Sequence, residues 1–120
     1  MMISMCLKAA DLGHAATKWV QHEEWCRLVM TEFYEQGDEE ESLGLPKSFL
    51  CDRSLHDKEF VPSQIGFINF VVKPLYEELR AADELLQLSK GQEISRICIA
   101  NLEANALEWE KKQKENKREE

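Results

Sequence analysis

Residues 19–36 read WVQHEEWCRLVMTEFYEQ, and side chains suited to burial recur in this stretch at steps of three and four residues. That spacing places them on one face of an α-helix, with charged side chains on the other face. The members of the shared face are Trp19, His22, Cys26, Val29, Met30 and Phe33. The sequence therefore predicts a helix over residues 19–36 that packs on a core through this face.

Two more helices flank this one in the chain. The first covers residues 2–12 and ends near Gly13, because glycine tolerates the backbone angles of a helix stop. The other begins at Pro62 or Ser63, since proline suits a first helical turn and serine suits a cap, and it continues to about residue 88. Pro74 lies inside this helix and is expected to kink it, because proline removes a backbone donor.

A last helix follows a break predicted at Lys90 and Gly91. Its inward face is predicted to hold Ile94, Ile97, Cys98, Leu102, Ala106 and Trp109. Residues 37–41 are expected to be an acidic, exposed connection and residues 49–62 a long irregular loop. Strand signals are scarce, so the predicted fold is all-α.

The composition limits the function classes. The net charge is −8, and residues 1–109 carry −9 of it, which argues against binding to nucleic acid or to an anionic membrane surface. No apolar run reaches the roughly 18 residues that a membrane span needs. The four cysteines match neither a zinc module nor a disulfide scaffold, so we expect free thiols and a cytoplasmic protein. Residues 110–120 are charged and are expected to be a solvated helix end or a disordered tail.

Three segments carry a resemblance to a known family. They are KAADLGHA at residues 8–15, EFYEQGDEEESLGLPKSFLCDR at residues 32–53 and SQIGFINFVVKPLY at residues 63–76. In this order and spacing they resemble the second half of the class I 3′,5′-cyclic-nucleotide phosphodiesterase catalytic domain, and most of all its calmodulin-dependent, dual-specificity branch. The resemblance covers residues 8–79.

The resemblance implies that residues 1–109 are the C-terminal portion of a compact helical catalytic domain of the HD type, here incomplete. It implies an enzyme that hydrolyses cyclic AMP, cyclic GMP or both to 5′-nucleotides. The cofactors implied are two divalent metals, zinc together with magnesium or manganese, which activate a hydroxide. The family's H-N-x-x-H and H-D motifs supply the general acid and most metal ligands, and this chain contains neither.

The resemblance also assigns individual residues. It places no catalytic residue in this chain and makes Asp11 the family's last metal-ligating aspartate; the alternative is a helix-end carboxylate facing solvent. It implies a nucleotide pocket in which Gln64 bonds the purine edge, Phe67 stacks on one purine face and Val29 clamps the other. His14, Trp25 and Leu50 match further pocket positions. For His14 the alternative is an ordinary loop histidine, and for the apolar members it is core packing.

Two hypotheses follow. In the first, the chain is part of a longer phosphodiesterase whose partner is the cyclic nucleotide and whose full-length form is compatible with a homodimer. In the second, it is a catalytically inactive helical protein that retains part of the purine pocket or an interaction surface. The choice between cyclic AMP and cyclic GMP stays open, because a glutamine amide bonds either purine by rotating.

Overall fold

The computed structural model describes residues 2–87, 90 and 92–119 of the chain. Helices are the only regular secondary structure among the described residues, which confirms the all-α prediction. The helices, in chain order, are α1 (Met2–Asp11), η1 (Gly13–Ala16), α2 (Trp19–Ser42), η2 (Arg53–Leu55), α3 (His56–Phe67), η3 (Ile68–Val72), α4 (Lys73–Leu86), η4 (Ile94–Ile99) and α5 (Ala100–Glu119). The segments η1 and η2 are 3₁₀ helices, and η3 and η4 are π-helical.

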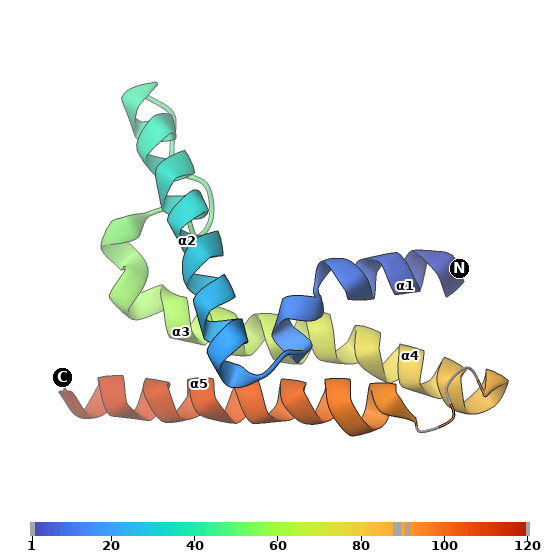
Figure 1. Cartoon of the computed structure of the whole chain (residues 1–120). Helices are drawn as coiled ribbons and strands as arrows, with labels where there is room; N and C mark the ends of the chain where they lie inside the picture. The colour runs from blue at the N-terminus through green and yellow to red at the C-terminus, as the bar shows by residue number, and fades with distance from the viewer. Residues whose placement is uncertain (1, 88–89, 91, 120) are drawn as a thin grey trace.

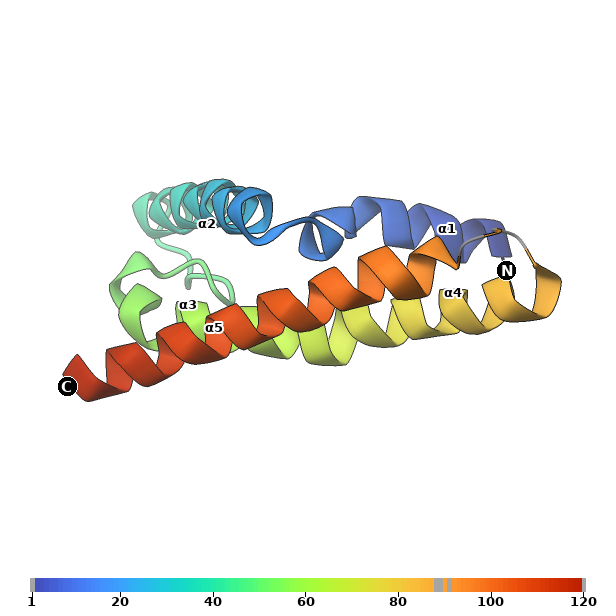
Figure 2. The same cartoon turned by 60° about the horizontal axis from the view of Figure 1, so that its bottom comes forward.

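The helices form two layers. The continuous run from α3 to α4 lies beside α5, and the two run in opposite directions (Figure 1). Helices α1 and α2 both lie on one side of this pair (Figure 2). Helix α2 rises steeply away from the pair (Figure 1). The radius of gyration is 16.6 Å, above the roughly 14 Å of a compact domain of this length. The arrangement is therefore more open than that of a self-contained domain.

The core lies between the run from α3 to α4 and α5, with η1 and α2 packed against α5. Ile68, Val72 and Leu102 are fully buried there, and Trp109 is 1% exposed. Buried polar side chains tie η1 to α5, because the Asn105 amide donates hydrogen bonds to the carbonyls of Ala15 at 2.9 Å and of Thr17 at 2.8 Å. The two helices α2 and α5 are thus fixed on each other through the turn between α1 and α2.

The inward face predicted for the last helix is correct except at one position. Leu102, Ala106 and Trp109 are buried and Ile94 and Cys98 are partly buried, but Ile97 is 47% exposed. The π-helical turn of η4 has more residues per turn than an α-helix, so the regular spacing used for the prediction does not hold at Ile97.

The prediction that the helix from Trp19 ends at residue 36 is wrong. Helix α2 continues to Ser42, and Gly37 is buried against the backbone of Cys51, where a Cβ atom would lie 1.9 Å from the Cys51 carbonyl oxygen. The loop after α2 supports the extra turns, because Glu40 accepts hydrogen bonds from the backbone and the hydroxyl of Ser48. Residues 38–41 are accordingly helical.

The irregular loop predicted over residues 49–62 is also shorter than expected. Asp52 caps η2 by accepting a hydrogen bond from the backbone of Ser54 at 3.0 Å, and α3 begins directly afterwards at His56. Asp57 and Glu59 lie in the first turn of α3, where negative charge is favourable. Pro62 therefore lies inside a helix, with its side chain exposed, rather than at the start of one.

Pro74 falls in the first turn of α4, directly after the π-helical segment η3. The wider π turn is one way to accommodate a residue that cannot donate a backbone hydrogen bond. Helix α4 ends at Leu86, where Gln87 adopts a left-handed conformation with φ of 51°. Of the predicted helix end and break, residue 88 and Gly91 lie outside the described residues.

Residues 110–119 continue α5 as a charged helix end. None of the described helices is long and apolar enough to cross a membrane.

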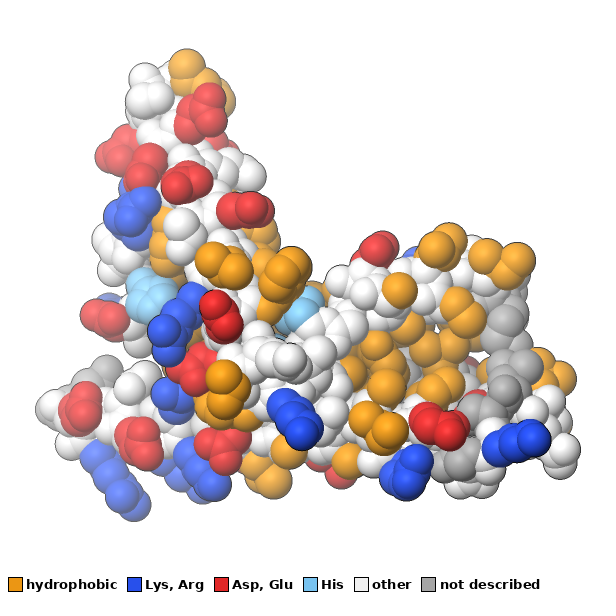
Figure 3. Space-filling view, in the orientation of Figure 1, with side chains coloured by type: hydrophobic (Ala, Val, Ile, Leu, Met, Phe, Trp, Pro, Cys, Tyr) orange, Lys and Arg blue, Asp and Glu red, His pale blue; other side chains and the backbone are white. Residues whose placement is uncertain are grey.

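Apolar side chains remain exposed along α1 and α2. Ile3, Leu7 and Val20 are 77%, 63% and 75% exposed. Figure 3 shows hydrophobic side chains gathered in the corner below α1 and beside α2. This exposed surface agrees with the open shape of the molecule.

Candidate functional site

A pocket with a volume of about 130 Å³ lies between α2, the loop before η2 and α3. It is lined by His14, Cys26, Val29, Met30, Phe33, Leu50, Ser63, Gln64 and Phe67. Complete ligand pockets measure roughly 300–1,000 Å³, so this one suits a single ring system rather than a whole nucleotide.

Five of the six side chains that the sequence assigns to a nucleotide pocket line this cavity. They are His14, Val29, Leu50, Gln64 and Phe67. The sixth, Trp25, is 51% exposed and lies outside it, in a neighbouring surface depression that shares His14. The Trp25 and His14 rings are 6.1 Å apart between centroids, so Trp25 lies beside the pocket rather than in its wall.

The aromatic wall of the pocket comes from η1 and α3. The rings of His14 and Phe67 are nearly parallel, with an interplanar angle of 9° and centroids 6.4 Å apart. Burial lowers the pKa of His14 below its usual value, which favours the neutral imidazole. The Nδ1 atom of His14 is buried and has no hydrogen-bond partner among the described residues. This end of the pocket therefore combines a flat, uncharged surface with one unpaired polar atom.

The polar end of the pocket holds Gln64 and Cys26. The Cys26 thiol donates a hydrogen bond to Gln64 Oε1, with 3.1 Å between the sulfur and the oxygen. Burial is the main cause that raises the pKa of Cys26 to about 12, so the thiol keeps its proton at neutral pH. The amide of Gln64 thus has a fixed partner on its oxygen side.

His22 lies behind Cys26 and is fully buried. Its Nε2 atom accepts a hydrogen bond from the indole nitrogen of Trp109 at 2.8 Å, so Nδ1 carries the proton and donates to the carbonyl of His14 at 3.1 Å. The pKa of His22 is lowered to about 4, and burial of the imidazole is the largest cause. His22 is therefore a neutral imidazole with one donor and one acceptor, both used.

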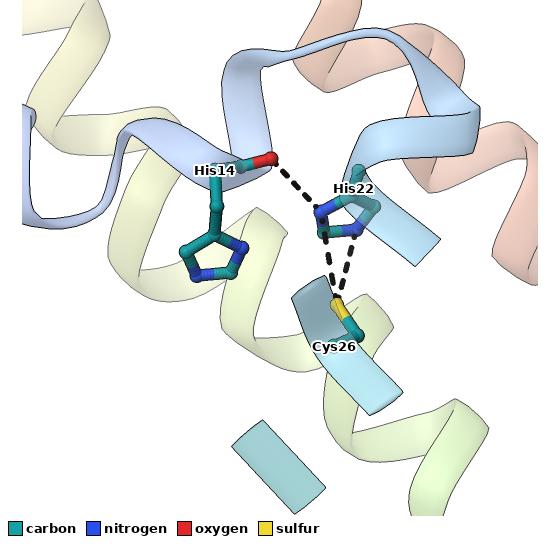
Figure 4. Close-up of side chains that lie close together, drawn as sticks. All are labelled: His14, His22 and Cys26. Carbon is teal, nitrogen blue, oxygen red and sulfur yellow. Dashed lines mark hydrogen bonds between the residues drawn. The ribbon is translucent and has the colours of Figure 1, made fainter. Parts of the chain in front are cut away.

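His14, His22 and Cys26 are close enough to suggest a metal site, since one ligand atom from each lies within 4.8 Å of the others (Figure 4). Two observations favour a hydrogen-bond network instead. Both nitrogens of His22 are already bonded, and the Cys26 sulfur lies 3.6 and 3.7 Å from them, almost equally far from both. A metal would also require the thiolate, whose formation burial opposes.

Asp11 is the last residue of α1, and its side chain is exposed. Within the described ranges it belongs to no group of three His, Cys, Asp or Glu side chains close enough to bind an ion. Zinc sites in proteins normally use three or four protein ligands. Among the described residues, therefore, Asp11 is not part of a metal site that this chain completes by itself.

Several pocket residues were not singled out as site residues by the sequence. Cys26, Met30 and Phe33 share the helical face of Val29 and were interpreted as core positions. Ser63 precedes Gln64 and was interpreted as a cap; its hydroxyl donates to the carbonyl of Phe60 at 2.6 Å. For the three residues on α2, the helical periodicity was the available signal, but periodicity does not separate pocket positions from buried core positions.

Comparison with known proteins gives consistent results. The family described as 3′5′-cyclic nucleotide phosphodiesterase matches residues 1–90. The dual 3′,5′-cyclic-AMP and -GMP phosphodiesterase beta of Plasmodium falciparum is 40% identical over 97% of this chain and 10% of its own length. The human dual specificity calcium/calmodulin-dependent 3′,5′-cyclic nucleotide phosphodiesterase 1B is 46% identical over 64% of this chain and 14% of its own length.

A solved structure supports the fold. The structure of LmjPDEB1 in complex with IBMX superposes with a TM-score of 0.72 and 26% identity, over 92% of this chain and 30% of that one. The chain therefore spans about a tenth to a seventh of the two curated relatives named above and under a third of the solved structure.

Proposed function

The chain belongs to the 3′,5′-cyclic nucleotide phosphodiesterase family, and on this premise we propose that it forms the purine-binding part of a catalytic domain that hydrolyses cyclic nucleotides to 5′-nucleotides. The observation that carries the proposal is the shared pocket of His14, Val29, Leu50, Gln64 and Phe67. These side chains come from η1, α2, α3 and the loop between the last two. Residues assigned from separate motifs meet in one small cavity.

The pocket chemistry suits a purine. The Phe67 ring offers a flat face for stacking, and Val29 supplies an aliphatic surface in the same cavity. The amide of Gln64 offers a polar group to a base edge, and an amide carries both donors and an acceptor. Neither cyclic AMP nor cyclic GMP is excluded by these three side chains alone.

The hydrolytic step belongs to the longer domain. Zinc together with magnesium or manganese would supply charge neutralisation and a metal-bound hydroxide there. In this chain Asp11 is the residue proposed to contribute one metal ligand. We propose that residues 1–109 are the catalytic-domain portion, that residues 110–120 extend beyond it, and that the chain alone is inactive.

The same proposal covers partners and location. The partner is the cyclic nucleotide, and the acidic body of the chain disfavours nucleic acid. A homodimer of the full-length protein and a cytoplasmic location remain predictions.

The experiment compares the full-length protein with this chain alone. Production of 5′-AMP and 5′-GMP is measured with added zinc and magnesium, with manganese in place of magnesium, and after chelation. We expect hydrolysis by the full-length protein that is lost on chelation, a large loss in its Asp11→Asn variant, and none by the chain alone. Failure of the metal-loaded full-length protein to hydrolyse either nucleotide would favour the inactive helical protein, whose exposed apolar surface would then serve an interaction.

A further inference from the structure

Leu50 occupies a turn position that ordinarily favours glycine. The backbone N–H of Cys51 donates a hydrogen bond to the carbonyl of Ser48 at 3.0 Å, which closes a turn over residues 48–51. Leu50 is the third residue of this turn and has a φ of 65°. Positive φ is unfavourable for a residue with a Cβ atom, and turns that need it at the third position usually hold Gly or Asn there. A leucine at this position therefore needs support from its surroundings.

The side chain of Leu50 is the reason that glycine would not serve here. It is half-buried and lines the same cavity as Val29 and Phe67. Glycine would relax the backbone of the turn but would remove this part of the apolar wall. The unfavourable backbone conformation is thus tied to the pocket, because the turn carries the leucine side chain to the cavity.

Glu40, in the last turn of α2, holds the first residue of this turn. Its Oε1 atom accepts a hydrogen bond from the backbone N–H of Ser48 at 3.2 Å, and its Oε2 atom accepts one from the Ser48 hydroxyl at 2.6 Å. The hydrogen bond from the hydroxyl is the largest cause that lowers the pKa of Glu40 below its usual value, so the carboxylate is ionised at neutral pH. Hydrogen bonds to an ionised acceptor are about twice as strong as neutral ones. Both donors of Ser48 are therefore fixed on one carboxylate.

Packing holds the last residue of the turn. Cys51 is 4% exposed, and its carbonyl approaches α2 so closely that a Cβ atom on Gly37 would lie 1.9 Å from the oxygen. Gly37 and Glu40 are three residues apart on α2, which places them near each other along the helix surface. Helix α2 thus holds the turn at both of its ends.

We propose that Glu40 is a positioning residue for the nucleotide pocket: through Ser48 it holds the turn in the conformation that places Leu50 in the pocket wall. This inference rests on the proposed function. Glu40 is not one of the side chains that line the cavity, so its effect on the bound base passes through the turn. Because Leu50 offers only hydrocarbon to the base, the effect is the same for cyclic AMP and cyclic GMP.

The expected size follows from the apolar contact that Leu50 supplies. Each methylene group removed from an apolar contact corresponds to a factor of about four in an equilibrium constant, so Leu50→Ala should raise the KM for both nucleotides about 4- to 15-fold. Glu40→Ala keeps the leucine but leaves its turn unsupported, and should raise both KM values about 2- to 10-fold. The kcat should stay unchanged, because a contact made equally in the ground state and the transition state affects binding alone.

The test measures KM and kcat for both nucleotides in the full-length protein and its variants. Glu40→Gln keeps an acceptor for Ser48 and should stay within about twofold of the wild-type KM. The matched control, Glu39→Ala, removes an exposed carboxylate from the neighbouring position of α2 and should change neither constant. In a Leu50→Ala background, Glu40→Ala should raise KM no further, because both substitutions act through one side chain.

The outcomes separate the two proposals. An unchanged KM in Glu40→Ala overturns the positioning role and leaves the proposed function standing, and so does a fall in kcat at unchanged KM, which reports a loss of folded enzyme. An equal rise in KM in the Leu50→Ala background overturns the route through Leu50. Hydrolysis of neither nucleotide by the wild-type protein overturns both proposals. If Glu40→Ala does not fold, Ser48→Ala decides: a rise in KM that disappears in the Leu50→Ala background supports the positioning role, and its absence overturns it.

Discussion

Acidification should destabilise the fold through His22. The pKa of this buried imidazole is lowered to about 4 in the folded chain, whereas an exposed histidine titrates near its ordinary value of about 6.5. The neutral form holds the Trp109 indole and the His14 carbonyl at once. Protonation would place a second donor against the Trp109 N–H.

The difference between the folded and unfolded pKa of His22 sets both the direction and the size of its effect on the free energy of unfolding. Because the folded pKa lies below the unfolded one, the contribution is fully present above about pH 6.5 and is lost as the pH falls toward 4. A difference of about 2.5 pKa units corresponds to about 3 kcal/mol, of which about 2.5 kcal/mol is lost by about pH 4.5. That is a large part of the roughly 5–15 kcal/mol that stabilises an ordinary domain.

The assay is urea unfolding of the full-length protein between about pH 7.5 and pH 4.5, followed by tryptophan fluorescence. The control is His22→Gln, whose amide can accept from Trp109 and donate to His14 but does not titrate. Carboxylates that titrate in the same range are common to both proteins, so the difference between their pH dependences reports His22. Equal pH dependences in the two proteins would refute the reasoning.

Two further substitutions test the packing. Gly37→Ala puts a Cβ atom 1.9 Å from the Cys51 carbonyl oxygen and should cost roughly 1–3 kcal/mol or more, measured by urea unfolding, whereas Gly66→Ala on α3 meets no atom within 4 Å and should be neutral or stabilising; equal effects would contradict the close approach. Asn105→Leu leaves the carbonyls of Ala15 and Thr17 without their donor and should cost about 1–3 kcal/mol in the same assay. Leu107→Ala, at a side chain that is 58% exposed, should cost less than about 0.5 kcal/mol. A neutral Asn105→Leu would contradict the role of Asn105 in joining η1 to α5.

Helical periodicity was a good guide to the long helices. It located the start of α2 at Trp19 and the buried face of α5 around Leu102 and Trp109. It failed where a tertiary contact or a capping interaction decides the boundary. The last turns of α2 depend on Cys51 approaching Gly37, and α3 begins directly after η2, the short 3₁₀ helix that Asp52 caps. Neither interaction leaves a periodic signal.

The candidate site, too, could be predicted from the sequence only in part. The family resemblance read from three motifs is confirmed by the match over residues 1–90, and the residues it assigned to a pocket are mostly found in one cavity. The network behind the pocket was not predictable. Trp109 and His22 are 87 residues apart and Cys26 and Gln64 are 38 apart, so spacing alone does not pair them.

The most direct test of the account is the effect of Phe67→Ala on the KM for cyclic nucleotides in the full-length protein, with Phe70→Ala as the matched control. Phe67 lines the pocket, whereas Phe70, three residues further along the chain, is 83% exposed. Base stacking on an aromatic ring is worth about 1–3 kcal/mol, so Phe67→Ala should raise the KM for both nucleotides about 5- to 150-fold while Phe70→Ala leaves it unchanged. An unchanged KM in Phe67→Ala, or an equal rise in both variants, would contradict the assignment of this pocket to the purine.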